Sequence, residues 1–138
     1  MDMSERIKLV GQQIFQSCID SYEAIECICL STTDGFPVLS LKKASLNFEA
    51  DAMAAASSTL YSVSNAVSRQ MLARPFRMSF IESAQGNVMF VAMSVANKEF
   101  VLTVSGSDAM NIGQLRAIVN RMVTDVYQHE LITDCVEH

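Results

Sequence analysis

The stretch from Phe48 to Leu72 constrains the fold of this chain more than any other part of its sequence. It contains no glycine or proline, and its apolar residues recur at steps of three and four, as in a helix with one apolar face. We predict that this face packs in the core. It comprises Met53, Ala56, Leu60, Val63, Val67 and Met71. The opposite face is small or polar, so a partner could approach it closely, although an ordinary surface helix explains it equally well. That face carries Asp51, Ala55, Ser58, Ser62, Asn65 and Arg69.

The residues before this helix predict a first helix and a β-hairpin. The first helix spans Ser4, its expected N-cap, to about Ser21, and Gly11 within it suggests that another backbone passes close by. A strand over residues 24–31 and a strand over residues 38–42 flank the dipeptide Asp34-Gly35. Asp-Gly favours a tight turn because glycine accepts positive φ without strain.

The residues after the central helix predict a three-stranded meander and a last helix. Residues 43–47 link the hairpin to the central helix, and strands are expected over residues 77–83, 88–95 and 100–105. Asn111 can cap a final helix that persists to about Gln128. The element order is αββαβββα. Short connections favour antiparallel pairing, so we predict an α+β fold: a five-stranded antiparallel sheet with helices on both faces.

Length and charge limit the class of protein. The 138 residues predict a single domain, with residues 129–138 as a polar tail that frays. No apolar run approaches the roughly 20 residues that cross a bilayer, and the N-terminus leads into no signal-peptide core, so we expect a cytoplasmic protein. The net charge of −5 argues against binding to nucleic acid or to an anionic membrane surface.

The cysteines are predicted to be core residues. Cys27 and Cys29 share one face of a strand at about 7 Å separation, too far for an easy disulfide. Cys18 and Cys135 are the other two, and the two histidines, His129 and His138, show no zinc-type spacing to any of them. We therefore expect packing in a reducing compartment, with no metal site.

No enzyme signature is present. The five glycines are scattered, and the loop around Gly106 lacks the lysine of a phosphate-binding loop. His129 stands at the end of the last helix, and the carboxylates are dispersed. A turn explains Asp34, a helix cap explains Asn111, and most of the nine methionines fall at core-facing periods. We predict no catalytic residue and no cofactor.

Several motifs together resemble the Roadblock family, whose best-known member is a dynein light chain. Their order and spacing cover nearly the whole chain. They are Asp34-Gly35-Phe36-Pro37-Val38, Phe48 to Ala56, Gly86-Asn87-Val88-Met89, Phe100-Val101-Leu102-Thr103-Val104 and Asn111-Ile112-Gly113-Gln114-Leu115-Arg116.

The resemblance implies a Roadblock/profilin-like sandwich that dimerises by pairing the first meander strand with its copy. The implied dimer interface is Arg77, Met78, Ser79, Phe80 and Ile81. The two central helices would then lie side by side on a face that, in the family, binds small Ras-like GTPases or motor and scaffold subunits. The implied partner-binding residues are Ala55, Ser58, Tyr61, Ser62, Asn65 and Arg69.

The resemblance favours one of three functions. Bacterial members of the MglB type stimulate a partner GTPase without supplying a catalytic residue, which implies a non-enzymatic dimeric regulator or scaffold for a small GTPase. A structural adaptor in a motor, cytoskeletal or signalling assembly, without a GTPase, is the first alternative. A small-ligand sensor is the second, since PAS- and profilin-like domains also sandwich a five-stranded sheet.

Overall fold

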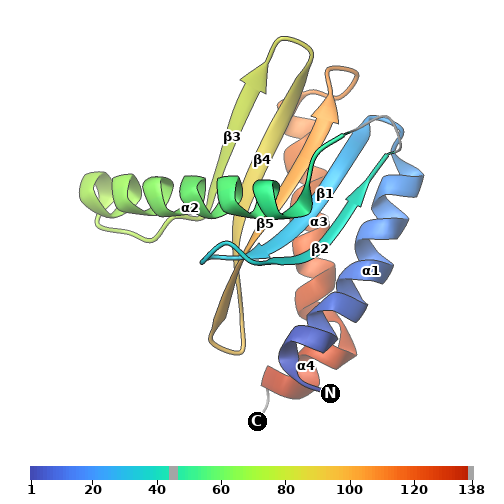
Figure 1. Cartoon of the computed structure of the whole chain (residues 1–138), viewed down its shortest axis with the longest axis vertical. Helices are drawn as coiled ribbons and strands as arrows, with labels where there is room; N and C mark the ends of the chain where they lie inside the picture. The colour runs from blue at the N-terminus through green and yellow to red at the C-terminus, as the bar shows by residue number, and fades with distance from the viewer. Residues whose placement is uncertain (44–46, 137–138) are drawn as a thin grey trace.

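The computed structural model describes residues 1–43 and 47–136, with side chains in the last helix described up to Thr133. Most of the predicted linker 43–47, the side chain of Cys135 and the whole of His138 therefore lie outside the described residues. The elements follow one another in the predicted order, with one additional helix at the end (Figure 1). They are α1 Met3–Ser21, β1 Ile25–Thr32, β2 Pro37–Lys42, α2 Ala50–Leu72, β3 Met78–Ser83, β4 Gly86–Val95, β5 Lys98–Ser107, α3 Ile112–Gln128 and α4 Glu130–Val136.

The five strands form one antiparallel sheet in the order β2-β1-β5-β4-β3. Helices α1, α3 and α4 contact one another on one face, and α2 crosses the other face (Figure 1). The predicted α+β fold is confirmed. The turn at Gly35 has φ 99°, which only glycine adopts without strain.

The hydrophobic core lies between the sheet and the α1, α3 and α4 side. Alternate residues of the central strands point into it, including Ile28 and Leu30 of β1 and Leu102 and Val104 of β5. Leu115 of α3 is buried against them. The α2 side of the sheet is much thinner, because in α2 just two small residues, Ala54 and Ser57, are buried.

The helix termini confirm one expected cap and correct another. Asn111 caps α3 in a capping box, with its side chain accepting from the backbone N–H of Gln114. The cap predicted at Ser4 is wrong, because α1 starts earlier: Asp2 accepts from the N–H of Glu5 at 2.8 Å. The close neighbour of Gly11 is a side chain rather than a backbone. A Cβ there would lie 3.0 Å from the Leu39 side chain.

The C-terminal segment does not fray as predicted over its described part. Residues Glu130–Val136 form α4, and Ile132 is fully buried. His129 sets up the turn between the last two helices by accepting from the N–H of Leu131 at 3.2 Å. The composition of this segment is polar. Ile132 nevertheless packs in the core, because the chain turns back towards α1 after α3, and local composition does not reveal such a long-range contact.

The predicted burial of α2 is the main error. Val63, Val67 and Met71 were expected in the core, yet 56%, 55% and 78% of their surfaces are exposed. The helix instead meets the sheet along a line between its two predicted faces, where Ala54 and Ser57 lie. Ser57 bonds the Thr103 hydroxyl of β5 at 2.8 Å, which fixes this orientation. Val63, Val67 and Met71 thereby lie on one exposed flank of the helix.

Candidate interaction surface

The apolar flank of α2 borders an open groove of about 630 Å³ beside β3. The flank itself is Val63, Val67, Met71 and Leu72, and we call these four residues the apolar stripe. Val63, Val67 and Leu72 line the groove together with Met78 at the start of β3. Large apolar side chains in a row on one flank of a helix are not typical of a monomer surface. This flank is therefore a candidate interaction surface.

Strand β3 continues the same exposed surface. It pairs with β4 on one side and forms one edge of the sheet, where Phe80 and Ile81 are 53% and 42% exposed. The opposite edge strand, β2, is protected differently: it begins with Pro37 and ends with Lys42, both of which discourage pairing with another strand. The edge of β3 has apolar residues at its centre, so it is the edge suited to pairing.

The polar flank of α2 is tied to the rest of the chain. The Tyr61 hydroxyl donates to Glu99 at 3.2 Å, and its ring meets Phe76 edge to face at 6.0 Å between centroids. Asn65 accepts from the N–H of Phe76 at 3.0 Å. Partial burial, followed by the neighbouring Glu99 carboxylate, raises the pKa of Tyr61. These residues, with Arg69, line a hollow of about 230 Å³.

The predicted partner-binding residues thus fall into two groups. Ala55, Ser62 and Arg69 are exposed and free to meet a partner. Ser58, Tyr61 and Asn65 are half-buried and bonded within the chain, so they support the helix as well as forming part of its surface.

The predicted dimer residues Arg77, Met78, Ser79, Phe80 and Ile81 lie together on or beside β3. Sequence reasoning missed the apolar stripe as a surface, because the same spacing describes a core-facing helix. The one usable signal was the row of small residues at 54, 57, 64 and 68, which could also have been read as the packing face.

The charge of this region is opposite to that of the whole chain. Residues 52–81 contain Arg69, Arg74 and Arg77 and no acidic residue, in a protein of net charge −5. All three arginines are exposed. Arg74 and Arg77 line the apolar groove, and Arg69 lies on the polar flank. The positive charge lies around the groove between α2 and β3, whereas the far ends of the two elements carry the exposed carboxylates of Asp51 and Glu82.

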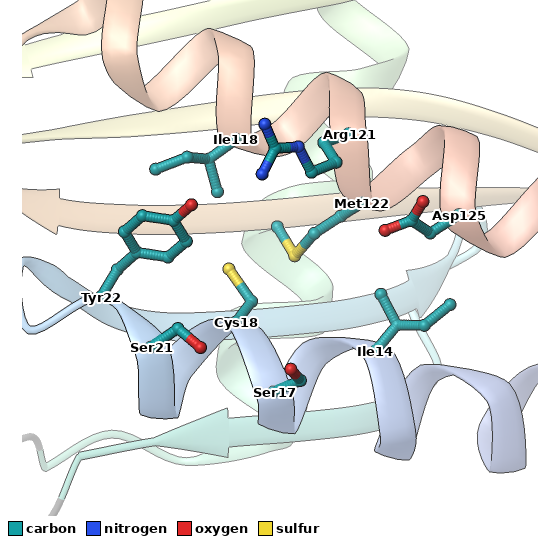
Figure 2. A pocket seen from close by; sticks show the side chains of 9 residues that line it. All are labelled: Ile14, Ser17, Cys18, Ser21, Tyr22, Ile118, Arg121, Met122 and Asp125. Atoms are coloured by element: carbon teal, nitrogen blue, oxygen red, sulfur yellow. The ribbon is translucent and has the colours of Figure 1, made fainter.

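A smaller cavity of about 170 Å³ lies between α1 and α3, on the other side of the sheet (Figure 2). Figure 2 shows the Cys18 thiol pointing from α1 towards Met122 of α3, with Arg121 and Asp125 beside it. Burial raises the pKa of Cys18 from 9.0 to about 11. The lining of this cavity combines polar and apolar side chains, and the Cys18 thiol stays protonated at neutral pH. We therefore do not consider this cavity a reactive site.

Two further findings concern the described part of the chain. Among its residues, no three His, Cys, Asp or Glu side chains are grouped closely enough to hold a metal ion. None of its helices combines the length and apolar character needed to span a bilayer.

Sequence comparisons find no relatives, whereas solved structures match. No protein-family model and no curated protein match the chain. MglB of Myxococcus xanthus shares 14% identity over 91% of this chain and 88% of its own, with a TM-score of 0.70. The gliding protein MglB of Thermus thermophilus shares 8% identity over 93% and 92%, with a TM-score of 0.75. A Roadblock/LC7 domain of Streptomyces avermitilis shares 17% over 83% and 92%, with a TM-score of 0.70.

At such low identities the similarity establishes the fold. This chain has the Roadblock/LC7 fold found in those three structures, over most of its length and of theirs. The resemblance inferred from the sequence motifs is confirmed at that level. A fold hosts many functions, so the function has to be argued from the surface.

Proposed function

We propose that this chain is a non-enzymatic regulator or scaffold that acts as a homodimer and binds a small Ras-like GTPase through the face carrying α2. The observation that carries the proposal is the exposed apolar stripe beside the free edge of β3. The Roadblock/LC7 fold, shared with two MglB structures, supports it. The protein works by presenting this surface, and a GTPase supplies the hydrolysis.

The dimer follows from what β3 and α2 leave uncovered. Pairing of β3 with β3 of a second copy would satisfy the unpaired edge of each sheet and join the two into one ten-stranded sheet. Symmetric pairing would also place the apolar stripe of one α2 against that of its partner. Val63 and Val67 would then lose the exposure that they have in the single chain.

The GTPase contact is assigned to the polar flank, because the apolar stripe is used by the dimer. Ala55 and Ser62 are short and exposed, so a partner helix or switch loop can come close to the α2 backbone. Arg69 adds a positive charge at the same flank, which favours an acidic partner surface. In the dimer, the polar flanks of the two α2 helices would together form one surface with two-fold symmetry.

Binding to small GTPases tests the proposal. Ras-like GTPases from the same genome, each loaded with GDP or a non-hydrolysable GTP analogue, are titrated into the protein and binding is measured calorimetrically. We expect at least one GTPase to bind with a preference for one nucleotide state. The Ser62→Arg variant should weaken that binding at least about tenfold, the loss of roughly 1.4 kcal/mol that a blocked close approach readily costs.

The control is Ser17→Arg, which places the same charge at an exposed position of α1 on the far side of the sheet. It should bind like the wild type. Absence of binding to every GTPase in both nucleotide states would reject the GTPase assignment, and an intact dimer in that case would favour the structural adaptor. Equal weakening by the two variants would reject the assignment to α2.

A further inference from the structure

Two thiols of β1 lie against each other on the α2 side of the sheet. The Sγ atoms of Cys27 and Cys29 are 3.3 Å apart, and each residue is 5% exposed. Strand neighbours on one face normally project in parallel, so this contact means that both side chains turn towards each other. Neither residue belongs to the hydrophobic core on the other face, and neither is used by the proposed interaction surface.

The surroundings of the pair are polar for a buried site. Ser40 of β2 and Thr103 of β5 flank Cys29 in the ladder, and Lys42 flanks Cys27. The Lys42 ammonium group donates to the Phe48 carbonyl at 3.0 Å and lies over the Phe48 ring, and its positive charge acts to lower the pKa of both thiols. A cation and hydroxyl groups next to a thiol stabilise its thiolate. These neighbours favour a thiolate at Cys29, against the effect of burial.

The hydrogen bond between the two thiols shifts their pKa values in opposite directions. Hydrogen bonding from Cys27 is the largest cause that lowers the pKa of Cys29, to about 7, and Ser40 and Lys42 act in the same direction against burial. The same hydrogen bond, together with burial, raises the pKa of Cys27. The two hydroxyl residues opposite Cys29 in the ladder, Ser40 and Thr103, favour Cys29 as the nucleophile of the pair. Cys27 is then the resolving thiol that keeps its proton until the second step.

We propose that Cys27 and Cys29 form a redox-active thiol pair that hydrogen peroxide converts into an intrastrand disulfide. The Cys29 thiolate attacks one peroxide oxygen, the O–O bond breaks, and the departing hydroxide takes up a proton to leave as water. Cys29 is then a sulfenic acid. Cys27 loses its proton and attacks the Cys29 sulfur, the S–O bond breaks, and a second water leaves. The two sulfurs lose two electrons, and one peroxide accepts them.

The backbone can follow this change. Same-face neighbours on a strand lie about 6.6 Å apart, near the upper limit for the Cα atoms of a disulfide. The pairing of β1 with β5 is irregular just before the pair, between Ile25 and Cys27, while the register from Cys27 to Cys29 is regular. Closing the disulfide therefore requires β1 to shorten at Ile28, next to a point where its ladder is already disrupted. Thr103 beside Cys29 anchors α2 through Ser57, which couples the pair to α2 by one step of the ladder. The chemical step itself does not depend on the proposed function.

Thiol counting on the wild-type protein tests the proposal. The folded protein is exposed to hydrogen peroxide, quenched, unfolded and alkylated with iodoacetamide, and its intact mass is measured. The chain has four cysteines, so the reduced protein takes up four labels. We expect the oxidised protein to take up two, to weigh two hydrogen atoms less before alkylation, and to regain four labels after treatment with dithiothreitol.

Peptide mapping locates the bond and supplies an internal control. Cys18, Cys27 and Cys29 fall in one tryptic peptide, Leu9–Lys42, whose fragmentation distinguishes the possible pairs. Cys18 is as buried as the pair but lacks its neighbours, and its pKa is raised to about 11. Cys29 should therefore be oxidised at least about tenfold faster than Cys18, because thiolate fraction outweighs the lower nucleophilicity of an acidic thiol.

Two variants separate the steps. In Cys27→Ser the reaction should stop at the Cys29 sulfenic acid, which dimedone traps, whereas Cys18→Ser should form the disulfide like the wild type. Retention of four labels in peroxide-treated wild type would overturn the proposal, and so would a disulfide that includes Cys18. Oxidation of Cys29 at the rate of Cys18 would show that the pair has no special reactivity.

Discussion

Two equally buried cysteines of this protein differ in pKa because their neighbours differ. Cys18 and Cys29 are both almost inaccessible, yet burial alone raises the pKa of Cys18 to about 11, whereas a hydrogen bond from Cys27 lowers that of Cys29 to about 7. The sequence predicted that these residues pack in the core, and they are buried. It could not reveal the 3.3 Å contact of Cys27 with Cys29, which depends on the side-chain rotamers in one strand.

The shifted pKa of Cys18 predicts a pH-dependent contribution to stability. The folded protein keeps this thiol protonated up to about pH 11, whereas a thiol in the unfolded chain ionises near its ordinary pKa of 9.0. Ionisation therefore favours unfolding, and stability present below pH 9 is lost as the pH rises towards 11. We expect the stability difference between the wild type and Cys18→Ala, measured by urea unfolding, to narrow over this range. A difference that stays constant from neutral pH to pH 11 would contradict the shift.

At the scale of secondary-structure elements, the periodicity of apolar residues predicts the type of element more reliably than the face that is buried. The steps of three and four in residues 48–72 predicted a helix, and α2 spans Ala50–Leu72. The same steps predicted the wrong buried face, because α2 packs on the sheet through the small residues Ala54 and Ser57 and not through its large apolar ones. An apolar flank that meets a second chain gives the same pattern. The helix α4 was missed for the related reason that Ile132 makes its contacts with elements distant in sequence.

The hydrogen bond between Ser57 and Thr103 is predicted to anchor α2 to the sheet. Both hydroxyl groups are buried, and their oxygens are 2.8 Å apart. Ser57→Ala should lower the free energy of unfolding by about 1–3 kcal/mol, since it leaves the Thr103 hydroxyl buried without its partner. The double variant Ser57→Ala, Thr103→Val should cost less than the sum of the single variants. Urea unfolding at one fixed protein concentration measures all four proteins, and strict additivity would show that the bond contributes nothing.

At the scale of the whole molecule, the two faces of the sheet differ in how much apolar surface they bury. The side with α1, α3 and α4 contains the large hydrophobic core and holds the domain together. The α2 side is thin, and it presents an apolar stripe, a free strand edge and three arginines to the outside. Family resemblance implied partner binding on the α2 face, which stays a prediction, but it did not imply that the core lies on the α1, α3 and α4 side. The partner itself was not predictable, because its identity depends on the other protein's surface as much as on this one.

The central claim is that a second copy of this chain covers the apolar stripe of α2 and the free edge of β3. Size-exclusion chromatography with light scattering at micromolar concentration tests it most directly. We predict a mass twice the 15.2 kDa of one chain, and a shift towards the single-chain mass for Val67→Arg but not for Ser17→Arg. A wild-type protein that elutes at 15.2 kDa under these conditions would contradict the claim.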